Sequence, residues 1–417
     1  MKQKIQILTC LTAIALTFPA QAQEQTQKPA QTISGFVNYI WETSPAIAES
    51  KSRLLSSEAA KKAASKWQYN PEIEFGIDDI DGEKRTKTFG ISQTIDWSGK
   101  FISSGKTASF ELQAAIADND MVSQNTAINV LSNLSGYLTA KDIVDLALKR
   151  TELMERFAAL AKKSFKAGDI DQSEYNLAQL ALSEALIIQA DAQNTLAQNK
   201  QALDSSIGFP LEDGFTLPKL PEAMPELPIS TNEDEILKNL PSLRAIKSRE
   251  NAAKAVITNT RKNRLPDPTI GITGGKDAGA DMIGFSVSLP LNIFNNYGAE
   301  VDQAKANAIA EAKSGQNAYH NARTRLKAAQ SSYELSIKAW INWQENGAQA
   351  LAEQTNILDR KFKVGDLSAT DYLVQIEQAL DTQVAAKELH NKVWQSWFAW
   401  LDASGTINQW IKIQENK

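Results

Sequence analysis

The 417-residue sequence contains one cysteine, Cys10, and only two histidines, His320 and His390. These numbers exclude a disulfide framework, a Cys/His metal cluster and a Cys/His catalytic pair, and we predict that both histidines are ordinary helix residues. After the N-terminal segment no stretch has about 18 consecutive apolar residues, so no helical membrane span is predicted. The net charge of −5 comes without a basic stripe. That charge pattern argues against a nucleic-acid-binding protein.

Residues 1–22 have the pattern of a secretory signal peptide. Lys2 and Lys4 form a basic segment, an apolar stretch follows, and Ala20-Gln-Ala22 is a small-x-small cleavage site. Cleavage after Ala22 would leave a mature chain without cysteine. Lipidation of Cys10 is an alternative, although this residue lies inside the apolar stretch.

One eleven-residue segment occurs twice, 197 residues apart. The copies read Phe165-Lys-Ala-Gly168-Asp-Ile-Asp171-Gln-Ser-Glu174-Tyr175 and Phe362-Lys-Val-Gly365-Asp-Leu-Ser368-Ala-Thr-Asp371-Tyr372. Gly168 tolerates the left-handed conformation that ends a helix, and Asp171 and Glu174 have the spacing of a capping box. The second copy repeats this pattern with Gly365, Ser368 and Asp371. We therefore predict two helical-hairpin tips in a chain with an internal two-fold repeat.

The duplication divides the chain into five predicted parts. They are the signal peptide at 1–22, repeat one at 23–207, a proline-rich linker at 208–230, repeat two at 231–405 and a C-terminal tail at 406–417. Each repeat is predicted to hold a helix, a strand pair, a very long helix, the tip and a return helix. The first helices are expected at about 36–66 and 233–262, the long helices at about 100–166 and 299–363, and the return helices end near 205 and 403. A helix of about 60 residues spans about 90 Å, which favours a tube or a coiled coil over a compact domain.

The four predicted strands alternate apolar residues with polar or small ones. They lie at 72–78 and 88–95 in repeat one, and near 270–272 and 283–289 in repeat two. Such alternation is typical of strands with two different faces. In water two isolated hairpins would be marginal, and in lipid four strands would leave open edges. Closure therefore needs copies of the chain, with the apolar face toward lipid and the Gly, Ser and Thr face toward a lumen.

Aromatic residues flank the predicted strands. They are Trp67, Tyr69, Trp97, Phe101, Phe294 and Tyr297. We predict that they form the aromatic girdle of a membrane interface. The alternative, that they cover a small soluble core, stays open.

With this order of elements the sequence resembles the TolC family of outer-membrane efflux proteins, and within it the cobalt-zinc-cadmium (CzcC-like) branch. The residues that carry the resemblance are Asn70-Pro71-Glu-Ile-Glu, Ile91-Ser-Gln-Thr-Ile-Asp-Trp-Ser-Gly99-Lys, Pro266-Asp-Pro268-Thr-Ile and Ser288-Leu-Pro290-Leu-Asn-Ile-Phe294. The resemblance implies a mostly α fold, in which a homotrimer joins a helical tunnel (α-barrel) to one 12-stranded transmembrane β-barrel. Ser98-Gly99-Lys100-Phe101 departs from the Gly-Gly-Lys-Arg of the metal branch.

The resemblance also implies the sites. The tips, with Gly168, Asp169, Gly365 and Asp366, would dock on a periplasmic adaptor (membrane fusion) protein that connects to an inner-membrane RND pump. Asp371 matches the position of the family's acidic periplasmic constriction, so Asp371 and its neighbour Tyr372 are the gate candidates. Val374 stands where the family has a second acid. A plain helix-capping role for Asp371 is the alternative.

Three further patterns have simpler readings. Gly105-Lys106-Thr107 is no phosphate-binding loop, because the first glycine of that motif would fall on Lys100. The segment Asp79-Ile-Asp81-Gly82 echoes a calcium loop, but Ile77 and Thr88 occupy its first and last ligand positions. Five tryptophans are predicted to pack in the middle of the tunnel rather than to form a ligand platform. They are Trp340, Trp343, Trp394, Trp397 and Trp400.

These observations predict a channel in the outer membrane of a Gram-negative bacterium that extends into the periplasm. It would be the passive exit duct of a tripartite efflux system, without a cofactor and without enzyme activity, because no nucleophile, base or metal set converges. Heavy-metal cations are the first substrate class, by resemblance only. The alternatives are drug efflux, type I secretion, or a soluble periplasmic coiled-coil scaffold.

Overall fold

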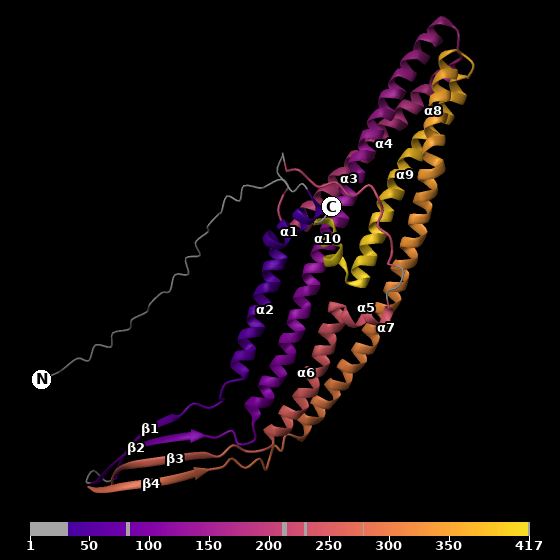
Figure 1. Cartoon of the computed structure of the whole chain (residues 1–417). Helices are drawn as coiled ribbons and strands as arrows, with labels where there is room; N and C mark the ends of the chain where they lie inside the picture. Colours follow the sequence, from indigo (N-terminus) through magenta and orange to yellow (C-terminus); the bar gives the residue numbers. More distant parts are fainter. Residues whose placement is uncertain (1–31, 81–83, 211–214, 229–231, 278, 416–417) are drawn as a thin grey trace, which may run out of the picture.

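The computed structural model describes residues 32–80, 84–210, 215–228, 232–277 and 279–415. The predicted signal peptide with Cys10 lies outside these residues, as do parts of the linker and of both hairpin loops. The molecule is elongated, with a sheet at one end, two helical tips at the other and long helices between them (Figure 1).

The two repeats fold alike. Repeat one contains α1 (Ile33–Thr43), α2 (Pro45–Ala64), β1 (Glu72–Ile80), β2 (Lys84–Thr94), α3 (Lys100–Ala167) and α4 (Gln172–Ile207). Repeat two contains α5 (Glu233–Asn239), α6 (Pro241–Asn263), β3 (Thr269–Asp277), β4 (Ala280–Ser288), α7 (Gly298–Asn342), the π-helical turn η1 (Trp343–Gly347), α8 (Ala348–Lys363) and α9 (Ala369–Ser404). The chain continues into α10 (Ile407–Glu415), where only a tail was expected. The predicted mostly α class with a small β part is confirmed.

The first helix of each repeat differs from the prediction, because a proline divides it in two. Pro45 and Pro241 are the first residues of α2 and α6. A residue that precedes proline is driven out of the helical region, and Ser44 and Leu240 are indeed extended, with ψ of 126° and 123°. The same break in both repeats supports the duplication.

The second long helix also differs from the prediction, because η1 interrupts it. Gly347 explains why the turn is tolerated there: a Cβ atom on Gly347 would lie 2.3 Å from Cε3 of the Trp343 ring. The indole of Trp343 therefore lies across the backbone of the last residue of the turn. The first long helix, α3, runs unbroken for 68 residues.

The strands lie side by side in one order, the helices that adjoin them lie side by side in the same order, and together they form a wall. The strands are antiparallel in the order β1-β2-β3-β4, and the helices next to them pack α2 on α3, α3 on α6 and α6 on α7. Toward the tips, α4 packs on α3, α3 on α9, and α9 on α7 and α8. The wall therefore ends laterally at β1 and β4 in the sheet, and at α2 and α7 in the adjoining helices.

The largest apolar core lies in the middle of the molecule, where α1, α3, α9 and α10 meet. Trp394, Trp397 and Trp400 are buried in it, which confirms that these tryptophans pack. The described part of the linker has no regular secondary structure, and its apolar side chains pack against this core. Tyr333 donates a hydrogen bond to the carbonyl of Pro225 and so ties the linker to α7.

Among the described residues, no helix combines the length and the apolar character that crossing a membrane would need.

The glycine of η1 gives a first prediction. Gly347→Ala should destabilise the protein by about 1–3 kcal/mol, because the new methyl group collides with Trp343. The matched control is Gly315→Ala in α7, whose Cβ would lie 3.6 Å from Ile246 in ordinary contact; this change should be neutral or stabilising by up to about 1 kcal/mol. Thermal unfolding followed by circular dichroism measures both. A lower melting temperature in Gly315→Ala but not in Gly347→Ala would contradict the account of the turn.

Candidate functional site

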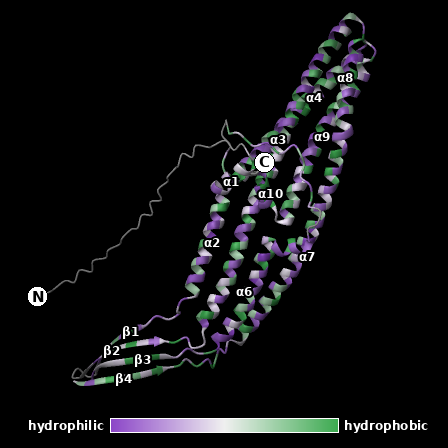
Figure 2. Cartoon of the chain, in the orientation of Figure 1, coloured by the Kyte–Doolittle hydropathy of each residue, from purple (hydrophilic) through white to green (hydrophobic). Residues whose placement is uncertain are grey.

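The sheet has two faces of opposite character, as the alternation predicted. Cross-strand partners share a face, and Phe75 pairs with Phe89, Ile91 with Ile272, and Ile272 with Phe285. The apolar face is exposed: Phe285 is 70% and Ile283 88% accessible. Figure 2 shows hydrophobic and hydrophilic residues along the same strands. An exposed apolar face of this kind marks an interaction surface.

The opposite face is lined by small residues. Gly90, Thr273 and Gly284 form one cross-strand row, and Ser92, Gly271 and Ser286 form the next. The rows end on β1 at Glu74 and Glu72. Asp78 of β1 and Asp277 of β3 add two more carboxylates to this face, and the bases Lys87 and Lys276 lie on the apolar face, near the hairpin loops.

Both outer strands of the sheet have a free edge. β1 pairs only with β2, and β4 only with β3. Each outer strand therefore presents a row of backbone N–H and C=O groups without partners in the described chain, which is a template for another strand.

The six predicted interface aromatics differ in exposure at the junction between sheet and helices. Trp67, Trp97 and Phe294 are exposed, with Phe294 fully accessible; the ring of Trp67 stacks on Phe101 at 6.0 Å. Tyr69 and Tyr297 are partly buried. Tyr297 adopts a left-handed conformation, with φ of 57°, and precedes α7.

Further exposed apolar side chains accompany these aromatics. They are Ile102, Leu265, Leu291 and Ile293. Trp67, Trp97, Phe294 and these four side chains are called the collar below.

Beneath the collar lies a buried ion pair that sequence reasoning did not find. Lys100 Nζ and Tyr69 Oη both donate to Asp267 Oδ2, at 2.7 and 2.8 Å. The side chains of Lys100 and Asp267 are 11% and 4% exposed. Burial, together with the hydrogen bond to Asp267, raises the pKa of Tyr69. Because Tyr69 and Lys100 belong to repeat one and Asp267 to repeat two, the pair joins the two repeats where strands become helices.

A signal for this pair was present in the motifs. Asp267 stands between Pro266 and Pro268, and Lys100 follows the glycine that starts α3. Gly99 is left-handed, with φ of 71°, and its carbonyl accepts a hydrogen bond from Lys262 Nζ at 2.9 Å. What the sequence could not show is that these segments, 167 residues apart, meet.

The two tips have the predicted backbone geometry. Gly168 and Gly365 are left-handed, with φ of 82° and 80°. Asp169 N donates to Ser164 O, and Asp366 N donates to Lys361 O, at 2.9 Å in both cases. A Cβ atom on either glycine would meet nothing within 4 Å, so the space beside both turns is open.

The aromatic residues of the repeated segment stack on each other in both tips. Phe165 lies 5.1 Å from Tyr175, and Phe362 lies 4.2 Å from Tyr372, measured between ring centroids. This contact, across the turn from one helix to the next, explains why Phe and Tyr recur at the same spacing.

The capping boxes differ between the tips. In the first, Glu174 N donates to Asp171 Oδ1 at 2.9 Å and Asp171 N donates to Glu174 Oε2 at 3.3 Å, as predicted. In the second, Asp371 N donates to Ser368 Oγ at 3.0 Å, but the carboxylate of Asp371 accepts from the Ser368 hydroxyl at 2.7 Å instead of from the backbone. The reciprocal backbone bond is absent because aspartate is one methylene shorter than glutamate.

The two gate candidates are placed differently. Asp371 is exposed, and so is Val374 one turn later. Tyr372 is only 4% exposed, and its hydroxyl donates to Asp359 Oδ1 at 2.8 Å. Burial and this hydrogen bond raise the pKa of Tyr372. Tyr372 therefore packs α8 against α9, and Asp371 is the one of the two that a pore could use.

Two ion pairs join α9 to α3 in the part of these helices between the tips and the central core. Neither pair was predicted. Arg150 donates to Asp381 at 2.8 Å, and Lys387 to Asp142 at 2.6 Å. Arg150 is buried, whereas Asp381 is largely exposed. These pairs hold the second hairpin against the first.

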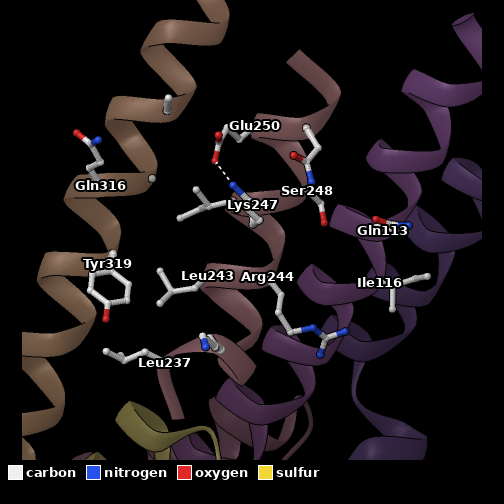
Figure 3. Close-up of a pocket in the computed structure, with 15 residues that line it drawn as sticks. Gln113, Ile116, Leu237, Leu243, Arg244, Lys247, Ser248, Glu250, Gln316 and Tyr319 are labelled. Atoms are coloured by element: carbon white, nitrogen blue, oxygen red, sulfur yellow. Dashed lines mark hydrogen bonds and ion pairs between the residues drawn. The ribbon is translucent and has the colours of Figure 1, made fainter. Parts of the chain in front are cut away.

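A cavity of about 860 Å³ lies between α3, α6 and α7. Figure 3 shows Leu237, Leu243 and Tyr319 on one side of α6, with Arg244 and Ile116 on the other. Lys247 pairs with Glu250 at 2.9 Å, and Arg244 with Asp120 at 3.3 Å. None of the predicted site residues lines this cavity, and the described residues hold no group of three metal-ligating side chains.

Comparison with known proteins finds one family and one fold. The sequence profile described as "Outer membrane efflux protein" matches residues 41–209 and 233–406, one segment in each repeat. No curated protein sequence matches the chain.

Solved channel structures share the fold. The Campylobacter jejuni CmeC outer membrane channel is 15% identical, with a TM-score of 0.75 over 97% of this chain and 94% of that one. The open state of the Neisseria gonorrhoeae MtrE channel is 16% identical, with a TM-score of 0.70 over 90% and 89%. CusC, whose structures concern folding and transmembrane channel formation, is 15% identical, with a TM-score of 0.75 over 89% and 92%.

The buried ion pair gives a second prediction. Lys100→Met should destabilise the protein by about 3–5 kcal/mol, because it leaves the Asp267 carboxylate buried without its cation. The double variant Lys100→Met, Asp267→Leu removes both charges and should recover most of the loss. Denaturant unfolding of the wild type, of Lys100→Met, of Asp267→Leu and of the double variant measures the four free energies. A double variant as unstable as the sum of the single variants would show that the two groups do not depend on each other.

Proposed function

We propose that this chain, which belongs to the outer membrane efflux protein family, is the outer-membrane exit duct of a tripartite efflux system. The duct is passive, and the energy for transport comes from an inner-membrane RND pump. Its place is the outer membrane of a Gram-negative bacterium, with the helices extending into the periplasm.

The sheet carries this proposal. Its exposed apolar face suits the hydrocarbon of a bilayer, and its small-residue face suits the lumen of a channel. The edges of β1 and β4 cannot stay open in lipid, where unpaired backbone groups cost several kcal/mol each. Pairing of β4 with β1 of the next copy removes every edge. Three copies give one barrel of twelve strands, as in the TolC family that the sequence resembles.

The helices extend the barrel into a tunnel. Because α2, α3, α6 and α7 have the lateral order of the strands, closing the sheet also brings α7 beside α2 of the neighbouring copy. At 1.5 Å per residue the 68 residues of α3 span about 100 Å. A tunnel of this length bridges much of the periplasm.

Cations are the proposed substrate class, and heavy-metal cations of the CzcC-like type are the finer proposal. Glu72 and Glu74 lie on the lumen face of the sheet, and Asp371 is exposed at the second tip. A lumen lined by carboxylates raises the local concentration of cations and favours their passage over that of anions.

The tips are the proposed docking surface for a periplasmic adaptor. They are the turns farthest from the sheet (Figure 1), and the space beside Gly168 and Gly365 is free of side chains. A helical hairpin of a partner could enter there and contact the backbone next to Asp169 and Asp366.

The faces of the sheet give a third prediction. Phe285→Arg should impair insertion by about 2–4 kcal/mol if Phe285 lies near the bilayer midplane. The matched control is the neighbouring Ser286→Arg, which should insert normally and change the conductance, because Ser286 lies on the lumen face opposite Gly271. Trimer yield in the outer-membrane fraction and single-channel current in a planar bilayer measure the two effects. Equal insertion with unchanged conductance in both variants would sink the channel proposal and favour a soluble scaffold.

The exposed carboxylate of the second tip gives a fourth prediction. Three copies of Asp371 near the three-fold axis would repel one another, and a multivalent cation would bind between them. Asp371→Asn keeps an acceptor for the Ser368 hydroxyl and removes the charge. It should reduce block by a trivalent cation added from the periplasmic side about tenfold or more, with the melting temperature almost unchanged. Single-channel recording tests this; equal block of both proteins would leave Asp371 as a helix cap only.

A further inference from the structure

Three of the four helices next to the sheet, α2, α3 and α6, are basic there in an otherwise acidic protein. Residues 58–66, 100–116 and 250–264 together contain nine Lys and Arg and three Glu, while the whole chain has a net charge of −5. These three segments are the ends of α2 and α6 and the start of α3. The positive charge is therefore concentrated in the band beside the collar.

Contacts within the protein, or a position at the C-terminal end of a helix, explain most of these basic residues. Lys100 pairs with Asp267, and Lys262 donates to Gly99 O. Lys61, Lys62 and Arg261 lie in the last turn of their helices, where the helix dipole favours positive charge.

Neither kind of explanation applies to Lys106. It lies in the second turn of α3, far from the negative end of the helix dipole, so the dipole does not stabilise its charge. Its side chain is exposed, and the contacts of the described chain include neither a hydrogen bond nor an ion pair of Lys106.

The neighbours of Lys106 in the Gly105-Lys106-Thr107 motif are explained by packing. A Cβ atom on Gly105 would lie 2.8 Å from Ser65 Oγ, so this glycine lets α2 approach α3. Thr107 is buried, and its hydroxyl donates to Ser103 O at 3.2 Å. Of the three residues of this motif, Lys106 is the one without a hydrogen bond or ion pair to another described residue.

Lys106 lines a cavity of about 250 Å³ between α3 and α6. Lys254 enters the same cavity from α6, and the other lining residues include the polar Ser103, Asn251 and Thr258 and the apolar Phe110. Lys254 also pairs with Glu250, outside this cavity. Two lysine side chains, hydroxyl and amide groups and one aromatic ring match a phosphate that is attached to a small organic group.

In the proposed channel the cavity lies next to the layer of lipid headgroups. Lys106 is six residues after Lys100, about 9 Å along the helix axis, and it lies one turn from Ile102 of the collar, on the same face of α3. The headgroup layer on each side of a bilayer is several ångström thick, and a lysine side chain can extend toward it.

We propose that the groove between α3 and α6 binds the phosphate of an anionic glycerophospholipid in the inner leaflet, with Lys106 and Lys254 as its cationic ligands. This inference rests on the proposed outer-membrane channel. It adds an electrostatic anchor beneath the apolar collar, because basic residues near a membrane surface attract anionic headgroups.

The test uses the full-length assembled channel in detergent and a fluorescent phosphatidylglycerol. The double variant Lys106→Gln, Lys254→Gln should bind this lipid about tenfold or more weakly. The control Lys149→Gln, Lys338→Gln changes the same charge at exposed lysines far from the collar and should bind like the wild type. Phosphatidylglycerol should raise the melting temperature of the wild type, and diacylglycerol with the same chains should not.

Three outcomes would overturn the proposal. The first is an equal loss of lipid binding in both double variants. The second is that inorganic phosphate at the same concentration raises the melting temperature as much as phosphatidylglycerol does. The third is that the channel is retained on isolated peptidoglycan and that the lipid has no effect on it. Single-channel activity of the wild type in a planar bilayer distinguishes failure of the lipid-site proposal from failure of the channel proposal. Activity without lipid binding would remove the headgroup site only, whereas a chain that forms no channel would remove the proposed function itself.

Discussion

The open edges of a four-stranded sheet with one exposed apolar face constrain the rest of this protein. A sheet of this kind cannot be complete in one chain, because its outer backbone groups need partners and its apolar face needs lipid. Closure by copies of the chain satisfies both needs. The helices then inherit the order of the strands, since α2, α3, α6 and α7 continue from them side by side.

Two kinds of contact hold this arrangement in register. At the junction, the buried pair of Lys100 and Asp267 joins the repeats where strand geometry changes to helix geometry. Far from it, the Phe–Tyr stacks close both hairpins, and Arg150 with Asp381 ties the second hairpin to the first. The central core of tryptophans lies between these two levels. These contacts thus stabilise the structure at both of its ends and in its middle.

Acidic and basic side chains are concentrated at different positions along the long axis of the molecule. Carboxylates lie on the lumen face of the sheet, and an excess of basic side chains lies on the helices below the collar. A carboxylate is exposed again at the second tip. A cation that moves through the proposed duct would meet negative charge at both ends.

The sequence by itself determined the order of the main helices and strands, the duplication, the two tips and the faces of the strands, because helix caps, left-handed glycines and period-two alternation are local signals. Even the family resemblance rests on such local motifs and their order. Only the tertiary structure decided which distant segments meet: that Asp267 neutralises Lys100, that Tyr372 is buried and Asp371 is not, and that Trp343 lies across Gly347. These outcomes depend on the packing of helices up to 68 residues long. The residues next to a buried charge in the sequence do not specify its distant partner, and the residues next to a helix turn do not specify which of its sides stays exposed.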